Sequence, residues 1–266
     1  MILKRHDGGA KILAGGQSLM PAHNMRLSAP EVLVDINRID GLSGVTLADG
    51  VLRIGAMTRQ VELEHCRLVA QHAPLIADAM LHVAHAAIRN RGTIGGSLAF
   101  ADPSAELPAC ALALDARLIL AGAGGRRAVE AVDFFRDLFI TAIESNEILV
   151  EVEIPVAGPD TRHGFAELAR RHGDYAMVGV AINPEMRLGV FHDTRLVCFG
   201  VGNVPVIARN AGAALAGRPN TPEERDAAAE ALGLDLDPPQ DLNASAEMRL
   251  HLARVLTRRT LEGLRA

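Results

Sequence analysis

The chain has 266 residues, about half of them apolar, and a formal net charge of −5 from 27 Lys and Arg against 32 Asp and Glu. This size suits one large domain or two modest ones, with enough apolar residues to bury a core. The net negative charge argues against binding to nucleic-acid phosphates, and the aromatic residues are few, with seven Phe, one Tyr and no Trp. Proteins and small molecules are therefore the expected partners. Neither a signal peptide nor an apolar run of ~20 residues is present, which predicts a cytoplasmic protein without a membrane span.

The first 157 residues predict short strands and helices in turn. Asp49–Gly50 is a dipeptide typical of a hairpin turn. The expected strands are Lys11–Ala14, Val32–Ile36, Val45–Leu47, Val51–Ile54, Arg117–Leu120, Ala128–Val129 and Ile148–Ile154, the last three in one sheet. The expected helices are a stretch containing Pro21, Thr58 to about His65 with Thr58 as its cap, Pro74–Ala86, and one that starts at Asp102–Ser104 with Glu106 in its first turn.

Gly158–Asp160 is the expected linker, and the pattern changes after it. Three short strands predict an antiparallel meander: Ala176–Ile182, Leu188–Val190 and Leu196–Val201. Three helices are expected next: Ala208–Ala216, Pro222–Leu232 and Ser245–Leu264. Strands followed by helices indicate an α+β fold, and the chain divides into domains of residues 1–157 and 161–266.

Two glycine pairs carry the chemistry, one in Ala14–Ser18 after the first strand and one in Thr93–Ser97. Paired glycines allow positive φ and let a ligand approach the backbone. Successive amide groups in such turns form a concavity that binds anions, and the hydroxyls of Ser18 and Thr93 can donate to phosphate oxygens. The two loops together predict a binding site for a diphosphate. Either one alone is equally consistent with a tight turn or a bulged strand.

Several other residues have alternative interpretations. Arg89 and Arg91 either neutralise phosphate or lie solvated beside a turn. His82 and His85, three apart on one predicted helix, lack a third ligand for a metal. The three cysteines are expected to be buried thiols, because they contain no C-x-x-C pair for zinc or an iron–sulfur cluster.

Four stretches in this order resemble the FAD-binding medium subunits of the xanthine oxidase and carbon monoxide dehydrogenase class of molybdenum hydroxylases. They are Lys11–Ile36, Ile88–Ala109, Glu147–Pro155 and Phe165–Ala181, with a weaker match at Ala244–Arg249. The resemblance covers nearly the whole chain. Phe165–Ala181 is most similar to relatives that act on N-heteroaromatic compounds or alkaloids.

The resemblance implies an FAD domain of the vanillyl-alcohol-oxidase type followed by a small α+β domain. Ala14–Ser18 would hold the diphosphate, Thr93–Ser97 would complete the grip, and Glu106 would contact the sugar chain. The main chain around Leu149 would lie beside the flavin ring, and Tyr175 would pack near the ring and control access to it. The implied cofactor-binding residues are Leu13, Ala14, Gly15, Gly16, Gln17, Ser18, Thr93, Ile94, Gly95, Gly96, Ser97, Glu106, Leu149 and Tyr175.

The same resemblance implies an oxidoreductase subunit that transfers electrons and needs no catalytic residue or metal of its own. A large partner would hold the molybdenum cofactor and hydroxylate the substrate. A small partner with two [2Fe–2S] clusters would pass electrons to FAD, which would pass them to an external acceptor. The expected assembly is a dimer of heterotrimers.

The chain departs from the family in two ways. Only ten residues precede Lys11, where relatives have a further strand and helix, so weaker support of the adenine or a start codon further upstream is expected. Gln17 and Met248 replace a histidine and a tyrosine found in some relatives. Two alternatives stay open: a stand-alone FAD oxidase of the same fold class, which could tether flavin through His23, and a non-catalytic module that has lost FAD.

Overall fold

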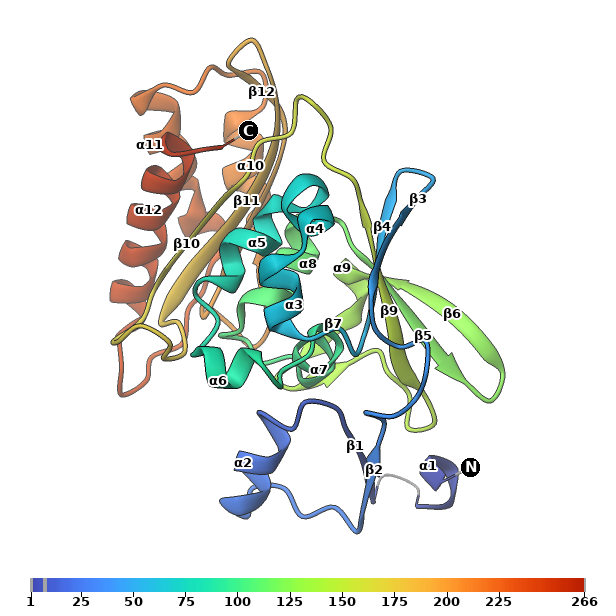
Figure 1. Cartoon of the computed structure of the whole chain (residues 1–266). Helices are drawn as coiled ribbons and strands as arrows, with labels where there is room; N and C mark the ends of the chain where they lie inside the picture. Colours follow the sequence, from blue (N-terminus) through green and yellow to red (C-terminus); the bar gives the residue numbers. More distant parts are fainter. Residues whose placement is uncertain (1, 7–8, 266) are drawn as a thin grey trace.

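Two antiparallel sheets organise the chain in a computed structural model that describes residues 2–6 and 9–265 (Figure 1). The helices before residue 158 are α1 (Ile2–Arg5), α2 (Leu19–Asn24), α3 (Gln60–His65), α4 (Arg67–His72), α5 (Pro74–Met80), α6 (Ala86–Arg89), α7 (Ile94–Phe100), α8 (Glu106–Ala113) and α9 (Ala131–Phe134). The strands there are β1 (Ala10–Leu13), β2 (Val32–Asp35), β3 (Val45–Ala48), β4 (Val51–Gly55), β5 (Arg117–Gly122), β6 (Gly125–Glu130), β7 (Phe135–Asp137), β8 (Ile140–Thr141) and β9 (Ile148–Pro155).

The first large sheet has five strands in the order β3-β4-β9-β5-β6. It confirms the predicted hairpin, in which Asp49 and Gly50 have φ of 53° and 71° and form the turn between β3 and β4. It also confirms that the strands at Arg117, Ala128 and Ile148 share a sheet. Outside this sheet, β1 and β2 pair in parallel, so their carboxyl ends meet at one edge.

The helical layer differs from the sequence prediction in three places. Thr58 does not cap α3, because its hydroxyl accepts from Gly44 N at 2.9 Å and donates to Gly44 O at 3.1 Å. The helix predicted over Pro74–Ala86 ends at Met80, and the chain reaches φ of 42° at Ala84 before α6. The helix predicted at Asp102 begins only at Glu106, because the Asp102 carboxylate accepts from Ser104 N in a turn.

The second sheet has four antiparallel strands and carries the three C-terminal helices on one face. Its elements are β10 (Gly164–Leu168), β11 (Val178–Arg187), β12 (Val190–Phe199), β13 (Val206–Ile207), α10 (Arg209–Leu215), α11 (Pro222–Asp235) and α12 (Ala246–Glu262). The three predicted helices and the α+β class are confirmed. The strand predicted at Leu188–Val190 is wrong, because Leu188 and Gly189, with φ of 51° and 80°, form the turn between β11 and β12.

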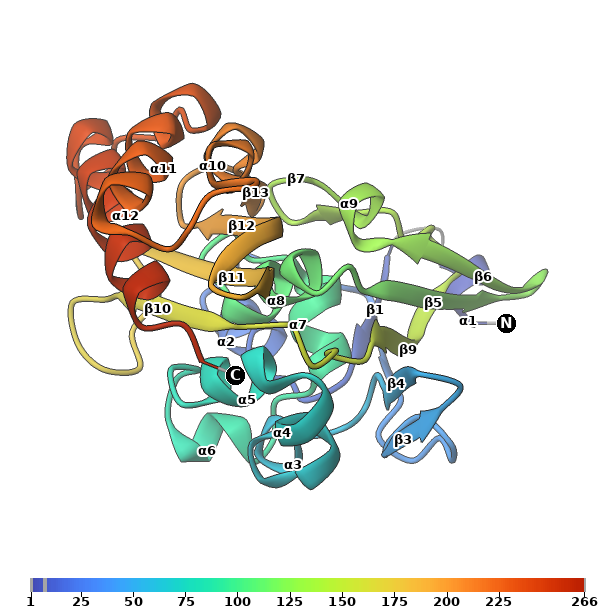
Figure 2. The same cartoon turned by 90° about the horizontal axis from the view of Figure 1, so that it is seen from above.

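The two faces of this sheet contribute to different hydrophobic cores. Val180, Ile182 and Cys198 pack against α10–α12, whereas Ala181, Val197 and Phe199 belong to a core that also contains α5 and α8. Figure 2 shows β11 and β12 lying between these helical layers. The chain therefore has a shared apolar interface between its N-terminal and C-terminal regions. Among the helices of the described residues, none combines the length and apolar character needed to cross a bilayer.

Candidate functional site

A cleft of about 380 Å³ lies at the edge where β1 and β2 end. Ligands of parallel strand pairs commonly bind beyond the carboxyl ends of the strands. The cleft is lined by Leu13, Ala14, Gly15, Gly16, Gln17, Met20, Pro21, Asp35, Asn37 and Arg91. Most of the first predicted glycine loop therefore faces one cavity.

The first loop offers unused amide groups. The amides of Gly15, Gly16, Gln17 and Ser18 donate to no acceptor within residues 2–6 and 9–265. Gly16 has φ of 72°, a conformation that favours glycine. The Asn37 side chain holds the loop by donating to Ala14 O at 2.8 Å. This arrangement can accept an anion such as a phosphate.

The second glycine segment is the beginning of a helix and not a loop. Thr93 is the N-cap of α7, and its hydroxyl accepts from Gly96 N at 3.0 Å. The other amides donate within the chain: Ile94 N to Thr58 O, Gly95 N to Ala56 O and Ser97 N to Thr93 O. The prediction that successive amides of this segment line an anion site is therefore wrong. Side-chain hydroxyls of Thr93 and Ser97 remain as possible donors.

The two glycine segments nevertheless converge. A Cβ added to Gly15 would lie 2.2 Å from Arg91 O and 2.9 Å from the Gly92 Cα, so only glycine permits this approach. A Cβ added to Gly96 would lie 3.6 Å from the Ala14 Cβ. Segments far apart in the sequence thus lie against each other, although the lining of the cleft includes Arg91 and no residue of Thr93–Ser97.

Arg89 and Arg91 have different environments. Arg89 donates to Glu64 at 2.8 Å and to Val83 O at 2.9 Å, and both charged side chains of this pair are mostly buried, so Arg89 serves the fold. Arg91 is exposed at the cleft, and within the described residues its guanidinium forms no ion pair. Arg91 is therefore a cation at the cleft without an ion-pair partner in the described part of the chain.

Asn37 and Arg59 are site residues that the sequence analysis missed. The Arg59 guanidinium donates to Asn37 Oδ1 at 2.7 Å and also to Arg91 O, so it ties the two sides of the cleft together. Asn37 N donates to Asp35 Oδ1, and this bond lowers the pKa of the Asp35 carboxyl. A polar residue directly after the second of two parallel strands is a signal that could have identified Asn37.

Leu149 is connected to the second segment through Ala56. Ala56 N donates to Val150 O at 2.9 Å, and Ala56 O accepts from Gly95 N at 2.8 Å. The register of β9 against β5 shifts near this point, between Ile119 and Leu120. The main chain next to Leu149 is therefore joined to the start of α7 by two hydrogen bonds through one residue, Ala56.

Glu106 and Tyr175 are two further predicted site residues, and neither lines the cleft; Glu106 begins α8, the helix after α7. Glu106 is 8 % exposed, and burial raises the pKa of its carboxyl to about 7. Tyr175 is 65 % exposed, and the pKa of its hydroxyl is raised by partial desolvation and by the nearby carboxyls of Asp102 and Glu106. These residues come from the two regions of the chain and lie close enough to interact electrostatically.

The loop that carries Tyr175 is fixed near both ends. A Cβ on Gly173 would lie 2.5 Å from the His85 ring, so the loop packs directly on this histidine. At the other end, Met177 N donates to Leu168 O at 2.8 Å. The buried Arg249 side chain donates to Met177 O and to Gly200 O, which gives the weaker match at Ala244–Arg249 a structural role.

Comparisons with known proteins match the chain in two parts. Residues 1–157 match the family model of the FAD binding domain in molybdopterin dehydrogenase, and residues 163–264 match that of the CO dehydrogenase flavoprotein C-terminal domain. The chain belongs to the family of FAD-binding medium subunits of molybdenum hydroxylases. It is thus a subunit of an oxidoreductase.

This medium subunit is similar to proteins of known name along nearly its whole length. It is 39 % identical to the 6-hydroxypseudooxynicotine dehydrogenase complex subunit alpha of Paenarthrobacter nicotinovorans, over 96 % of the chain and 87 % of the relative. It matches carbon monoxide dehydrogenase from Hydrogenophaga pseudoflava with a TM-score of 0.96 at 36 % identity, over 98 % of this chain and 91 % of the other. It matches quinoline 2-oxidoreductase from Pseudomonas putida 86 with a TM-score of 0.93 at 37 % identity, over the same shares.

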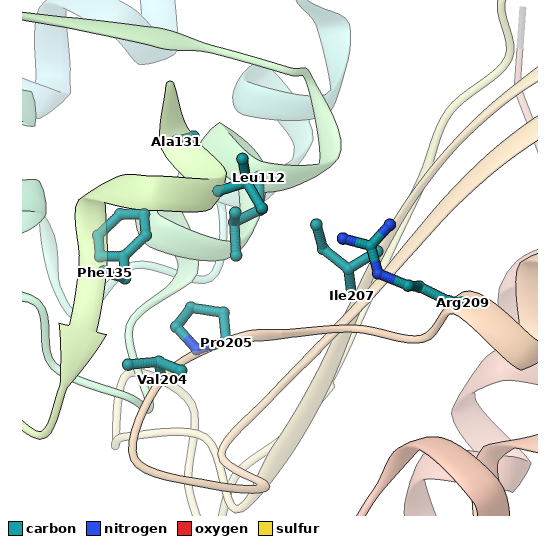
Figure 3. Close-up of a pocket in the computed structure, with 8 residues that line it drawn as sticks. Leu112, Ala131, Phe135, Val204, Pro205, Ile207 and Arg209 are labelled. Carbon is teal, nitrogen blue, oxygen red and sulfur yellow. The ribbon is translucent and has the colours of Figure 1, made fainter. Parts of the chain in front are cut away.

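The remaining candidates on this medium subunit do not form a further site. His82 and His85 do not share a helix, and within the described residues no group of three His, Cys, Asp or Glu is placed to hold a metal ion. Cys110 and Cys198 are buried free thiols and Cys66 is partly buried. A smaller pocket of about 180 Å³ between α8, α9 and the β12–β13 connection is lined mainly by apolar side chains, with Arg209 at one side (Figure 3). None of the predicted site residues lines it.

Proposed function

We propose that this medium subunit holds FAD with its diphosphate in the cleft and transfers electrons from [2Fe–2S] clusters of a small partner to an external acceptor. The observation that carries the proposal is the loop Gly15–Ser18, whose amides donate to no acceptor among the described residues and which lines the same cleft as Arg91. Amides and a guanidinium are the donors that phosphate oxygens prefer. When bound, the flavin supplies one- and two-electron redox chemistry, which the side chains of this chain lack.

Each residue of the site has a part in this proposal. Leu13–Ser18 hold the diphosphate from one side, and the Thr93 and Ser97 hydroxyls hold it from the other. Ile94, Gly95 and Gly96 allow the close approach of α7. Glu106 contacts the sugar chain, the main chain at Leu149 lies beside the ring, and Tyr175 packs near the ring and controls access to it. The hydrogen bonds of Ala56 with β9 and with the start of α7 support the place of Leu149.

The assembly belongs to the same proposal. A large subunit with a molybdenum cofactor and a small iron–sulfur subunit are the partners, in a dimer of heterotrimers, as the family membership supports. We place the domain boundary at the Gly158–Asp160 segment, giving domains 1–157 and 161–266. A cytoplasmic location stays a prediction from the sequence.

The substrate of the complex would be an N-heteroaromatic compound. Two similar proteins support this class by name: the 6-hydroxypseudooxynicotine dehydrogenase subunit and quinoline 2-oxidoreductase. The substrate would be hydroxylated in the large partner, and this chain would receive only the electrons.

Gly16→Val tests the cleft. A branched side chain at φ of 72° is strained, and its Cβ would lie 3.2 Å from the Leu13 and Met20 side chains that line the cleft. The loop would have to change shape, so we expect the purified complex to lose nearly all of its absorbance near 450 nm. Gly41→Val is the matched control, because Gly41 has φ of 78° and open space around it. The control should lose similar thermal stability and keep its FAD. Full FAD content in Gly16→Val would contradict the proposed diphosphate site.

A further inference from the structure

The Tyr175 segment, residues 173–177, joins β10 to β11 without regular secondary structure. Its tyrosine is 65 % exposed, whereas the next residue, Ala176, is 3 % exposed and belongs to the core shared by the two regions of the chain. An exposed connection of this kind moves on the nanosecond timescale unless contacts hold its main chain. The contacts that hold the segment therefore decide how firmly the Tyr175 ring is placed.

Gly200 supports the end of the Tyr175 segment. It follows β12 and has φ of 71°, a conformation that favours glycine. A Cβ at this position would lie 2.6 Å from Met177 O, so the two main chains are in direct contact. Gly200 N donates to Pro103 O at 2.8 Å, which links this point to the turn before α8. The end of the segment, the end of β12 and the N-terminal region thus meet at one place.

The Arg249 side chain joins these main chains from the beginning of α12. It is 5 % exposed, and its Nη1 atom donates to Met177 O and, at 2.8 Å, to Gly200 O. Among the described residues no other side chain donates to either carbonyl. A guanidinium presents its donors in a rigid fork, so it defines the positions of its acceptors more tightly than a flexible donor does.

Asp241 supplies the opposite charge that a buried guanidinium requires. Arg249 Nη2 donates to Asp241 Oδ2 at 2.6 Å. The other carboxylate oxygen accepts from Asn243 N at 2.8 Å and from Ala244 N at 3.0 Å, so Asp241 is itself fixed by the loop before α12. The carboxylate is 45 % exposed. A surface loop of the C-terminal region is therefore connected, through one arginine, to the main chain of the Tyr175 segment.

We propose that Arg249 is a positioning residue: it fixes the Tyr175 ring by holding the main chain of Met177 and Gly200, and Asp241 orients it for this role. Every link is a hydrogen bond or a direct main-chain contact within this chain. What Tyr175 does once it is fixed rests on the proposed function, in which it controls access to the flavin. The placement of the ring does not depend on that function and is measured separately.

Hydrogen exchange in the purified complex tests the hold on the main chain. Arg249→Met removes the guanidinium and keeps a long side chain. We expect the amides of Met177 and Gly200, which both have acceptors within the chain, to exchange about tenfold faster, the factor that corresponds to the loss of one hydrogen bond to a charged group. The amides of β5 and β9 should keep their wild-type rates.

Arg258→Met is the matched control. Arg258 lies on the same helix and also binds two carboxylates, those of Asp226 and Glu230, but its hydrogen bonds within the described residues include no main-chain carbonyl. This variant should leave the Met177 and Gly200 amides unchanged. Arg249→Lys keeps the charge and loses the fork, so its exchange rates should lie between those of the wild type and Arg249→Met.

Tyrosine fluorescence of the purified subunit reports on the ring itself, because Tyr175 is the only tyrosine and the chain has no tryptophan. The fast component of its anisotropy decay should be larger in Arg249→Met than in the wild type or Arg258→Met. Asp241→Asn, whose Oδ1 can still accept from the loop amides, should change the decay in the same direction by less. It decides the question if Arg249→Met does not fold.

Two results would overturn the positioning role. One is an unchanged anisotropy decay in every Arg249 and Asp241 variant that folds. The other is an equal increase of exchange in β5 and β9, which would mean that Arg249 contributes only to overall stability.

Reoxidation of the reduced complex by an external acceptor separates this inference from the proposed function. If Arg249 acts through Tyr175, Arg249→Met should change the reoxidation rate of the wild type and have no further effect on Tyr175→Ala. Additive effects of the two substitutions contradict the coupling. A wild-type complex without FAD contradicts the proposed function, while exchange and fluorescence still decide the role of Arg249.

Discussion

The two glycine segments have similar sequences and opposite local structures. In Gly15–Ser18 the amides point to no acceptor in the described part of the chain, whereas in Ile94–Ser97 every amide donates to a neighbour. Gly15 and Gly95 both pack so tightly that an added Cβ would lie 2.2 Å and 2.5 Å from another group. Both glycine pairs therefore permit close packing, and only the first segment also has amides without an acceptor among the described residues.

The helix α7 packs against the first loop through Gly96 and Ala14 without offering its amides. The helix begins at Ile94 and has only seven residues. The amides of its first turn donate to Thr93 and to the carbonyls of Ala56 and Thr58. These hydrogen bonds hold α7 against the segment that follows β4. The first loop can then be held against a rigid support, with Arg91 on the same side.

The largest expected effect is on stability, from Gly95→Ala. Its Cβ would lie 2.5 Å from the Ala56 Cβ and 2.7 Å from Ala56 O, both part of the buried core. Overpacking of this kind should lower the free energy of unfolding by about 2–3 kcal/mol. Urea denaturation measures it, with Gly124→Ala, which has open space, as the control. If Gly95→Ala were as stable as the control, close packing would not be the task of the second pair.

Arg91→Gln and Arg89→Gln should separate binding from folding. Removing the free cation at the cleft should weaken FAD binding about tenfold, since a charged hydrogen bond contributes about 1.5–3 kcal/mol. Arg89→Gln should leave FAD affinity unchanged and destabilise the fold, because Glu64 loses its partner at 2.8 Å. Fluorescence titration of FAD and thermal unfolding measure the two effects. Equal effects of both variants on FAD affinity would contradict the assignment of Arg91 to FAD binding and of Arg89 to the fold.

The smallest expected effect comes from Thr93→Val. The valine keeps the shape of threonine and removes the hydroxyl that accepts from Gly96 N. Loss of an N-cap typically costs about 1 kcal/mol. Thr93→Ser should retain this stability in the same thermal unfolding experiment. If Thr93→Val lost FAD while it stayed folded, the Thr93 hydroxyl would instead contact the cofactor directly.

Much of the fold could be predicted because local patterns decided it. The Asp49–Gly50 hairpin, the strands around Leu118 and Val152, and the helix capped by Ser245 follow from turn chemistry, apolar periodicity and capping. Predictions failed where a tertiary contact decided a residue's role. Thr58 bonds to Gly44 instead of capping a helix, and Leu188 lies in a turn despite its apolar side chain.

The sequence by itself determined the family of this protein, its FAD chemistry and the two glycine segments, because these depend on residue types in a fixed order. Only the tertiary structure decided which amides are free, which arginine faces the cleft, and that Asn37 and Arg59 join its sides. It also buried the Glu167 side chain of β10, which is only 5 % exposed. Hydrogen-bond partners and burial depend on segments distant in sequence, and no local pattern specifies them.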